Sequence, residues 1–232
     1  MDIDNILFLI SIWTIPVLIA VTFHEAAHGW VAWRLGDDTA KMLGRVTFNP
    51  IKHIDLFGTI LLPVMLLFAS SGRIMFGFAK PVPVNFNRLN YPRRDMILVA
   101  IAGPAANLLL AFMAAALFHT LPLISELSGD VAEWVLHNLR NALWINLLLC
   151  VFNMLPIPPL DGGRVLIGLL PASMARPLAR LEPAGFIIIL GAVFLLPFIG
   201  DKLGMKLNVF WWLVGAPASQ LQLWIAQLMG LV

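Results

Sequence analysis

The sequence predicts an all-α polytopic membrane protein, a bundle of about five to six transmembrane helices with a short membrane-associated β element. Composition predicts the helices, because hydrophobic residues make up 60% of the 232 residues, charged residues only 12%, and the mean hydropathy is +0.88. Several uncharged stretches are also long enough to cross a hydrocarbon core of roughly 30 Å. No repeat, low-complexity segment or linker marks a second soluble domain, so residues 1–232 are expected to form one domain.

Apolar runs bounded by charged or turn-forming residues give the expected helices in chain order. The first helix contains an uncharged run from Ile6 to Phe23. The expected helices, with boundaries soft by several residues, cover about 5–35, 56–70, 95–120, 133–155, 184–200 and 208–230.

The second apolar run, 56–70, is short for a membrane span. It has about 15 residues and contains Gly58 and Pro63, which suits a re-entrant or tilted segment. The sequence does not decide between a full span and a re-entrant segment, and we favour the re-entrant alternative. The stretch from Ile74 to Asn85 is apolar, contains β-formers and carries two prolines, so a short hairpin or edge strand at the membrane face is expected.

Charged residues between the apolar runs indicate the orientation in the membrane. The loop from Glu126 to Glu133 has no Lys or Arg and is expected outside, whereas the basic segments on both sides of residues 56–70 and after the fourth helix are expected to be cytoplasmic. We therefore expect a multi-pass protein of the cell (inner) membrane. Because the basic residues lie in short loops and the net charge is only +2, no nucleic-acid partner is expected.

The motif His24-Glu25-Ala26-Ala27-His28 lies directly after the uncharged run of the first helix. On a helix its two histidines are about 40° apart around the axis and one turn apart along it, so both can bind one Zn²⁺. The carboxylate between them can act on a zinc-bound water. A soluble metalloprotease would carry this motif on a helix of mixed polarity, so the apolar flanks here suggest hydrolysis inside a bilayer.

A zinc site needs a third protein ligand, and Asp161 is the best candidate. It follows twenty uncharged residues and stands in a stretch whose three prolines and two glycines prevent a regular helix. Irregular backbone at membrane depth is tolerated where it is buried in protein or lines a water-filled cavity. His28 lies roughly 9 Å and His24 roughly 15 Å from Arg34 along the helix axis. Asp161 lies just before Arg164, so the three candidates share a level towards the cytoplasmic side.

Three motifs in this order resemble the site-2 protease family, the intramembrane zinc metallopeptidases. The family signatures HExxH and NxxPxxxLDG match residues 24–28 and 153–162, and a GxxxN motif matches Gly103 to Asn107. The resemblance covers about residues 6–170 of the chain, and the expected catalytic core is about 5–170, followed by C-terminal helices at about 184–230.

The resemblance implies roles for individual residues. His24, His28 and Asp161 would bind one Zn²⁺ per chain, and Glu25 would be the catalytic base. Asn153 would hold substrate or stabilise the oxyanion, although an ordinary interhelical hydrogen bond is an open alternative. Asn107 is a weaker candidate for the same role, because Gly103 and Asn107 more simply serve close helix packing. Val82, Val84 and Asn85 resemble the family's β element, which presents substrate as an added strand.

The implied function is cleavage of membrane-anchored proteins at peptide bonds within or near their transmembrane segments. The loop from Leu121 to Ala132 is far too short for the PDZ domain that many relatives carry, so a compact form of the family is expected. The alternative is a transporter that uses intramembrane His and Asp to carry zinc or protons. Glu25 argues against it, because transport does not need a carboxylate between two ligands. The sequence does not predict an oligomeric state.

Overall fold

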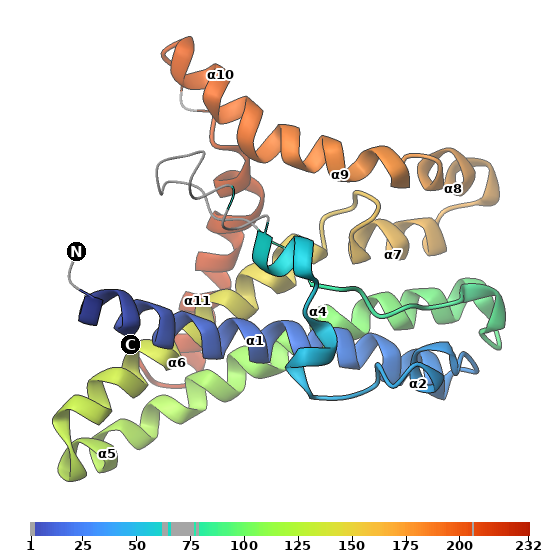
Figure 1. The fold of residues 1–232 in the computed structure, drawn as a ribbon. Coiled ribbons are helices and arrows are strands. Elements are labelled where there is room, and N and C mark those ends of the chain that lie inside the picture. The colour runs from blue at the N-terminus through green and yellow to red at the C-terminus, as the bar shows by residue number, and fades with distance from the viewer. Residues whose placement is uncertain (1–2, 62–64, 66–76, 78, 206) are drawn as a thin grey trace.

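The described residues form helices joined by loops. The computed structural model describes residues 3–61, 65, 77, 79–205 and 207–232 (Figure 1). The α-helices are α1 (Ile3–Arg34), α2 (Thr39–Met42), α4 (Pro92–Leu117), α5 (Leu121–Leu127), α6 (Gly129–Asn153), α7 (Asp161–Leu169), α8 (Ala172–Ala179), α9 (Glu182–Leu190), α10 (Leu196–Lys202) and α11 (Ala216–Leu228). Short 3-10 or π segments are η1 (Pro50–His53), η2 (Leu56–Leu61), η3 (Phe86–Arg88), η4 (Phe118–Thr120), η5 (Gly191–Leu195) and η6 (Trp211–Gly215).

Local sequence explains where two of the long helices begin. α4 begins at Pro92, whose missing N–H costs nothing in a first turn, and the Asp95 carboxylate accepts the N–H of Tyr91 at 2.8 Å. α6 follows Ser128, whose hydroxyl accepts the N–H of Val131 at 3.4 Å. These contacts fix the N-terminal ends of α4 and α6, which both pack against α1.

α1, α4 and α6 form the centre of the bundle, and α4 packs against α1, α6 and α7 (Figure 1). The buried face of α4 includes Ala111, Ala114 and Ala115, which pack with Leu143 and Leu147 of α6. Small side chains let helix backbones approach closely in a membrane, where van der Waals packing replaces the hydrophobic effect between helices. Close packing of α4 therefore brings polar groups of three helices within contact distance.

The number of candidate spans differs from the prediction of five to six helices. Among the described residues, four helices are long and apolar enough to cross a membrane: Leu7–Arg34, Pro92–Glu126, Gly129–Asn153 and Glu182–Gly200. The helix predicted at 208–230 is present as η6 and α11, but its three glutamines lower its hydropathy. The run predicted at 56–70 is described only at residues 56–61 and 65, so the re-entrant alternative falls outside the described residues.

The predicted β element is wrong for the residues that the structure describes, none of which is in a strand. Residues 80–85, here called the strap, run without a partner strand beside α1. Their prolines have no N–H to donate to a ladder, and the N–H groups of Val82 and Asn85 are accepted by carboxylates instead, Glu25 at 2.7 Å and Asp37 at 2.6 Å. The rest of the predicted hairpin, 74–76 and Phe78, lies outside the described residues.

Candidate metal centre

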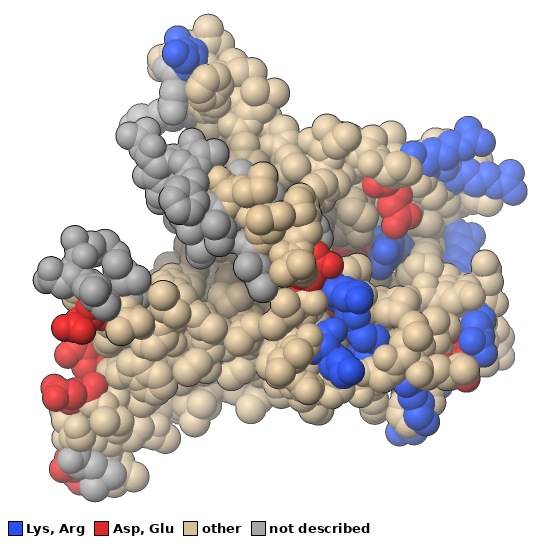
Figure 2. All heavy atoms as spheres, viewed as in Figure 1, with Lys and Arg blue, Asp and Glu red and all other residues tan. Residues whose placement is uncertain are grey.

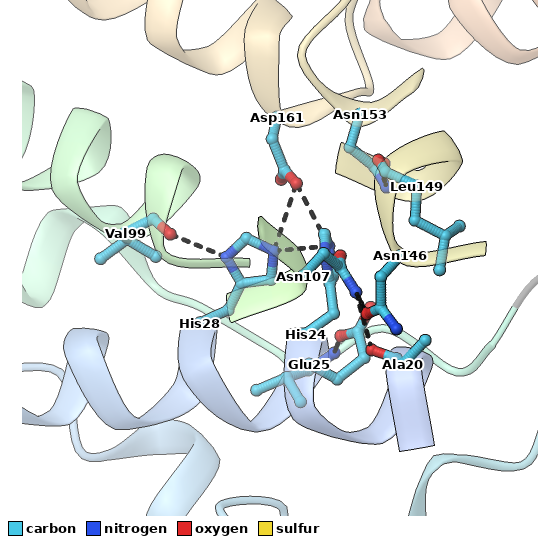
Figure 3. A network of polar contacts seen from close by, with 11 residues as sticks. Ala20, His24, Glu25, His28, Val99, Asn107, Asn146, Leu149, Asn153 and Asp161 are labelled. Carbon is cyan, nitrogen blue, oxygen red and sulfur yellow. Dashed lines mark hydrogen bonds and ion pairs between the residues drawn. The ribbon is translucent and has the colours of Figure 1, made fainter. Parts of the chain in front are cut away.

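His24 and His28 lie on the buried face of α1 and point to the same side (Figure 3). Their spacing of four residues places one imidazole a turn beyond the other, and the two Nε2 atoms are 3.0 Å apart. The predicted pair of histidines is therefore formed by α1 alone, without any contribution from tertiary structure.

Contacts across helices favour one tautomer of each neutral imidazole. His28 Nδ1 lies 2.7 Å from the carbonyl oxygen of Val99, and His24 Nδ1 lies 2.6 Å from Asn107 Oδ1. A carbonyl oxygen can only accept, so each Nδ1 must be the donor and a neutral imidazole then carries no proton on Nε2. Both Nε2 lone pairs therefore face the same space, which is the form in which histidine binds a metal.

Asp161 reaches this space from α7, above the two imidazoles in Figure 3. Its side chain is buried, with 6% of the residue exposed, and Oδ2 is 3.3 Å from Nε2 of each histidine. Among the described residues Oδ2 has no hydrogen-bond donor. The sequence pairing of His24 and His28 with Asp161, 133 residues beyond His28, is reproduced by the fold.

The proline- and glycine-rich stretch before α7 explains how Asp161 is placed. A methyl group on Gly162 or Gly163 would overlap backbone atoms of Met154 or Pro158 in the preceding loop. Only glycine allows the first turn of α7 to lie directly against this loop. Asp161 is the first residue of that turn, so the close contact fixes its position relative to α1.

The donor set fits zinc. Two imidazole nitrogens and one carboxylate oxygen are common zinc ligands, and all three atoms lie within 4.8 Å of one another. Tetrahedral zinc with bonds of about 2.0–2.2 Å sets its ligand atoms about 3.3–3.6 Å apart. The observed separations are 3.0, 3.3 and 3.3 Å. Three lone pairs this close repel one another unless a cation lies among them, so electrostatics also favours a metal.

Gly103 of α4 forms the floor of the candidate centre. A methyl group on Gly103 would overlap His28 Nε2 and lie 2.6 Å from His24 Nε2. The glycine of the GxxxN motif therefore gives the imidazoles room, beyond the helix packing that the sequence suggested. The asparagine of that motif, Asn107, is fully buried and is bound to His24, so it does not face an open substrate site.

Asn153 lies at the C-terminal end of α6, beside Asp161 in Figure 3. Its Nδ2 donates to the carbonyl oxygen of Leu149 at 3.0 Å, a contact within α6 and not the interhelical hydrogen bond that the sequence left open. Asn146, about two helical turns earlier, was missed by sequence reasoning although it is also a polar residue in an apolar helix. Its contact with Asn107 depends on how α4 and α6 pack, which no local pattern reveals.

Glu25 points to a different neighbour from the two histidines. Its Oε2 accepts the N–H of Val82 in the strap at 2.7 Å, and the residue is half-buried. At the other end of the strap, the N–H of Asn85 donates to the carboxylate of Asp37, which is fully buried just beyond the end of α1. Val82 and Asn85 were predicted to contact substrate. Their backbone N–H groups instead bind Glu25 of α1 and Asp37, just beyond the end of α1.

The other three histidines lie elsewhere. His53 Nε2 is 2.9 Å from the Thr47 carbonyl, His119 Nε2 is 2.9 Å from the Met229 carbonyl, and His137 is 3.9 Å from Glu133. Within the part of the chain that the structure describes, His24, His28 and Asp161 form the one group of three or more potential ligands.

Comparison with known proteins agrees with the motifs and the geometry. The model for "Peptidase family M50" matches residues 12–132 and 119–198. "Putative zinc metalloprotease YwhC" of Bacillus subtilis (strain 168) is 41% identical over 198 residues, which cover 84% of this chain and 84% of that protein. "Putative zinc metalloprotease Rip2" of Mycobacterium tuberculosis (strain ATCC 25618 / H37Rv) is 31% identical over 198 residues, covering 84% and 70%.

A shorter match is also informative. "Regulator of sigma-W protease RasP" of Bacillus subtilis (strain 168) is 35% identical over 74 residues, which cover 32% of this chain and 17% of that protein. No solved structure matches the chain significantly. These matches favour a peptidase over the transporter alternative and confirm the resemblance drawn from the motifs. The chain belongs to peptidase family M50, the site-2 protease family, and is a membrane zinc metalloprotease.

Proposed function

We propose that this protease cleaves membrane-anchored proteins at peptide bonds within or near their transmembrane segments. The observation that carries the proposal is the position of the candidate centre between α1, α4 and the segment after α6. The three helices α1, α4 and α6 form three of the four candidate spans. We infer that a substrate segment reaches this centre from the bilayer, and that residues 1–232 act as one domain with a catalytic core at about 5–170.

We propose His24, His28 and Asp161 as the ligands of one zinc ion per chain. Zinc held by three protein ligands supplies a Lewis acid and lowers the pKa of a bound water towards about 7. The chain's own contribution is to bury the three donors and to orient two of them: Val99 and Asn107 hold the imidazoles, as described above.

Glu25 is the proposed general base. The N–H of Val82 binds Oε2 and so restricts rotation of the carboxylate, which leaves Oε1 to accept a proton from the attacking water. A general base of this kind contributes about 10²–10⁴-fold in rate. Glu25 can then return the proton to the leaving amine, which completes the hydrolysis.

Asn153 is the residue that we propose for substrate positioning. Asn153 could donate to a substrate carbonyl or oxyanion if Nδ2 turns away from Leu149. Substrate contact by Val82, Val84 and Asn85 stays a prediction. Strand addition is not proposed, because the N–H groups of Val82 and Asn85 already have acceptors, the carboxylates of Glu25 and Asp37.

We place the protein in the cell (inner) membrane with the centre towards the cytoplasmic side. Figure 2 shows most Lys and Arg side chains in the half of the molecule that holds α2 and α8 and near the middle of the view, with a few acidic ones among them, while only acidic side chains are seen near α5 at the opposite end. A basic side chain on α10 lies apart from that cluster. Basic residues favour the cytoplasmic ends of spans, so this asymmetry supports the orientation.

The test is cleavage of a single-span model substrate by purified protein reconstituted in vesicles with zinc. Glu25→Gln should lower the cleavage rate by about 10²–10⁴-fold while zinc content stays at one per chain, because only the base is lost. Glu133→Gln is the matched control, since that side chain is 70% exposed in α6 and away from the ligands. Cleavage by Glu25→Gln at the wild-type rate would exclude Glu25 as base. Cleavage of soluble peptides but never of spanning substrates would exclude the intramembrane activity.

A further inference from the structure

Two asparagines are buried behind His24, in helices that are otherwise apolar on that side. Asn107 of α4 is 0% exposed and Asn146 of α6 is 2% exposed. A buried amide is costly unless its donors and acceptors are paired, and polar residues within spans are seldom without a role. The GxxxN motif includes Asn107, whereas no motif in the sequence includes Asn146.

The two amides and His24 form one directional chain of hydrogen bonds (Figure 3). Asn146 Nδ2 donates to the carbonyl oxygen of Ala142 at 2.8 Å, which turns Asn146 Oδ1 towards α4. Asn107 Nδ2 donates to that Oδ1 at 2.8 Å and to the carbonyl oxygen of Ala20 at 3.1 Å. Asn107 Oδ1 is thereby turned towards His24 Nδ1, 2.6 Å away.

The direction of this chain decides which nitrogen of His24 carries the proton. If the Asn107 amide were flipped, its oxygen would face two other acceptors, Asn146 Oδ1 and the Ala20 carbonyl, and its NH₂ would face His24 Nδ1. Asn146 Oδ1 opposes that flip, because two oxygens in contact at low dielectric repel. His28 needs no such chain, since the backbone carbonyl of Val99 cannot flip.

We propose that Asn146 is a positioning residue for the metal centre. Through Asn107 it holds His24 in the Nδ1–H form, so that Nε2 keeps its lone pair for the metal. Asn146 contacts neither a proposed metal ligand nor substrate, and it acts on His24 only through Asn107. The inference rests on the proposed role of His24 as a ligand.

A purely structural role would be to tie α1, α4 and α6 together, and the chain offers a matched control for it. Asn141, also in α6, donates from Nδ2 to the carbonyl oxygen of Ile12 at 2.9 Å. It ties α6 to α1 with the same kind of bond, but this bond does not reach the centre. Asn146→Leu and Asn141→Leu therefore remove comparable tethers, and only the first breaks the chain to His24.

The first measurement is zinc affinity of the full-length protein in detergent, by competition with a chelator. Asn146→Leu should weaken zinc binding by about 10–100-fold, as loss of an outer-shell partner typically does. Asn141→Leu should leave affinity within about threefold, and Asn146→Asp, which keeps an acceptor for Asn107 Nδ2, should recover part of the loss. In a His24→Ala background, Asn146→Leu should have no further effect, since the two residues act as a unit.

The second measurement is the ¹⁵N NMR signature of the His24 ring in metal-free protein. We expect one tautomer, protonated on Nδ1, in the wild type and in Asn141→Leu, and a mixture in Asn146→Leu. Equal zinc affinities for Asn146→Leu and Asn141→Leu, or an unchanged tautomer, would overturn the inference. If instead His24→Ala binds zinc as the wild type does, the proposed ligand set fails, and that outcome is distinct from failure of the inference.

Discussion

At the scale of single residues, the candidate centre combines donors from one helix with a donor from a distant segment. His24 and His28 are paired by helix geometry alone, and each has its Nδ1 bound to an acceptor so that Nε2 faces Asp161. Asp161 is the third donor, and its Oδ2 has no hydrogen-bond donor among the described residues. A buried carboxylate oxygen in that state is stabilised by a cation and is costly without one.

Replacement of Asp161 should therefore show its role directly. Asp161→Ala removes the one oxygen of the donor set, and we expect zinc affinity to fall by more than the roughly 10–100-fold typical of an outer-shell change. Zinc content after dialysis against a weak chelator measures this. Asp130→Ala, an exposed aspartate in the first turn of α6, is the control and should keep zinc. Equal zinc content in both variants would exclude Asp161 as a ligand.

At the scale of elements, α4 and the start of α7 owe their positions to glycines. Gly103 brings α4 against the two imidazoles, and Gly162 and Gly163 bring α7 against the loop that follows α6. The strap is the element that the sequence misassigned: its apolar residues and β-formers suggested a strand, but the carboxylates of Glu25 in α1 and of Asp37 just beyond α1 accept its N–H groups. Side-chain acceptors thus replaced the partner strand that a ladder needs.

A methyl group at position 103 should disturb the centre specifically. In an ordinary helix Gly→Ala is stabilising by roughly 0.5–1 kcal/mol, but overpacking in a filled core costs about 1–3 kcal/mol. We expect Gly103→Ala to weaken zinc binding by about 5–150-fold, the affinity equivalent of that cost. Gly191→Ala is the control, because a methyl group there meets nothing within 4 Å. Unchanged zinc affinity and activity in Gly103→Ala would show that the contact relaxes freely.

At the scale of the whole molecule, the charge distribution and the path of the chain are both in line with what the sequence predicted. The acidic end around α5 and the basic end around α2 and α8 lie on opposite sides of the bundle (Figure 2). The connection between α4 and α6 consists of η4 and α5, so no further domain is inserted between these two helices. This is the compact arrangement that the short loop predicted.

Orientation can be measured by cysteine labelling in cells, because Cys150 is the single cysteine of the chain. In a Cys150→Ala background, Ser125→Cys in α5 should react with a membrane-impermeant thiol reagent added from outside. Ser173→Cys in α8 should react only after the membrane is permeabilised, since the basic end is expected in the cytoplasm. Both positions are exposed in the structure. The reverse pattern would invert the proposed orientation.

The sequence by itself determined the membrane class, the HExxH pair and the nature of the missing ligand, because hydropathy and helical spacing are local properties. It also predicted Asp161 as the third ligand, since a carboxylate after a proline-broken apolar run has few explanations. The packing of α4 between α1 and α6 decided the rest. That packing made Gly103 the floor of the centre, turned Asn107 towards His24 instead of substrate, and added Asn146, a residue that no motif marked. These contacts join residues 39 to 83 positions apart, and separations of that size leave no periodic signal in a sequence.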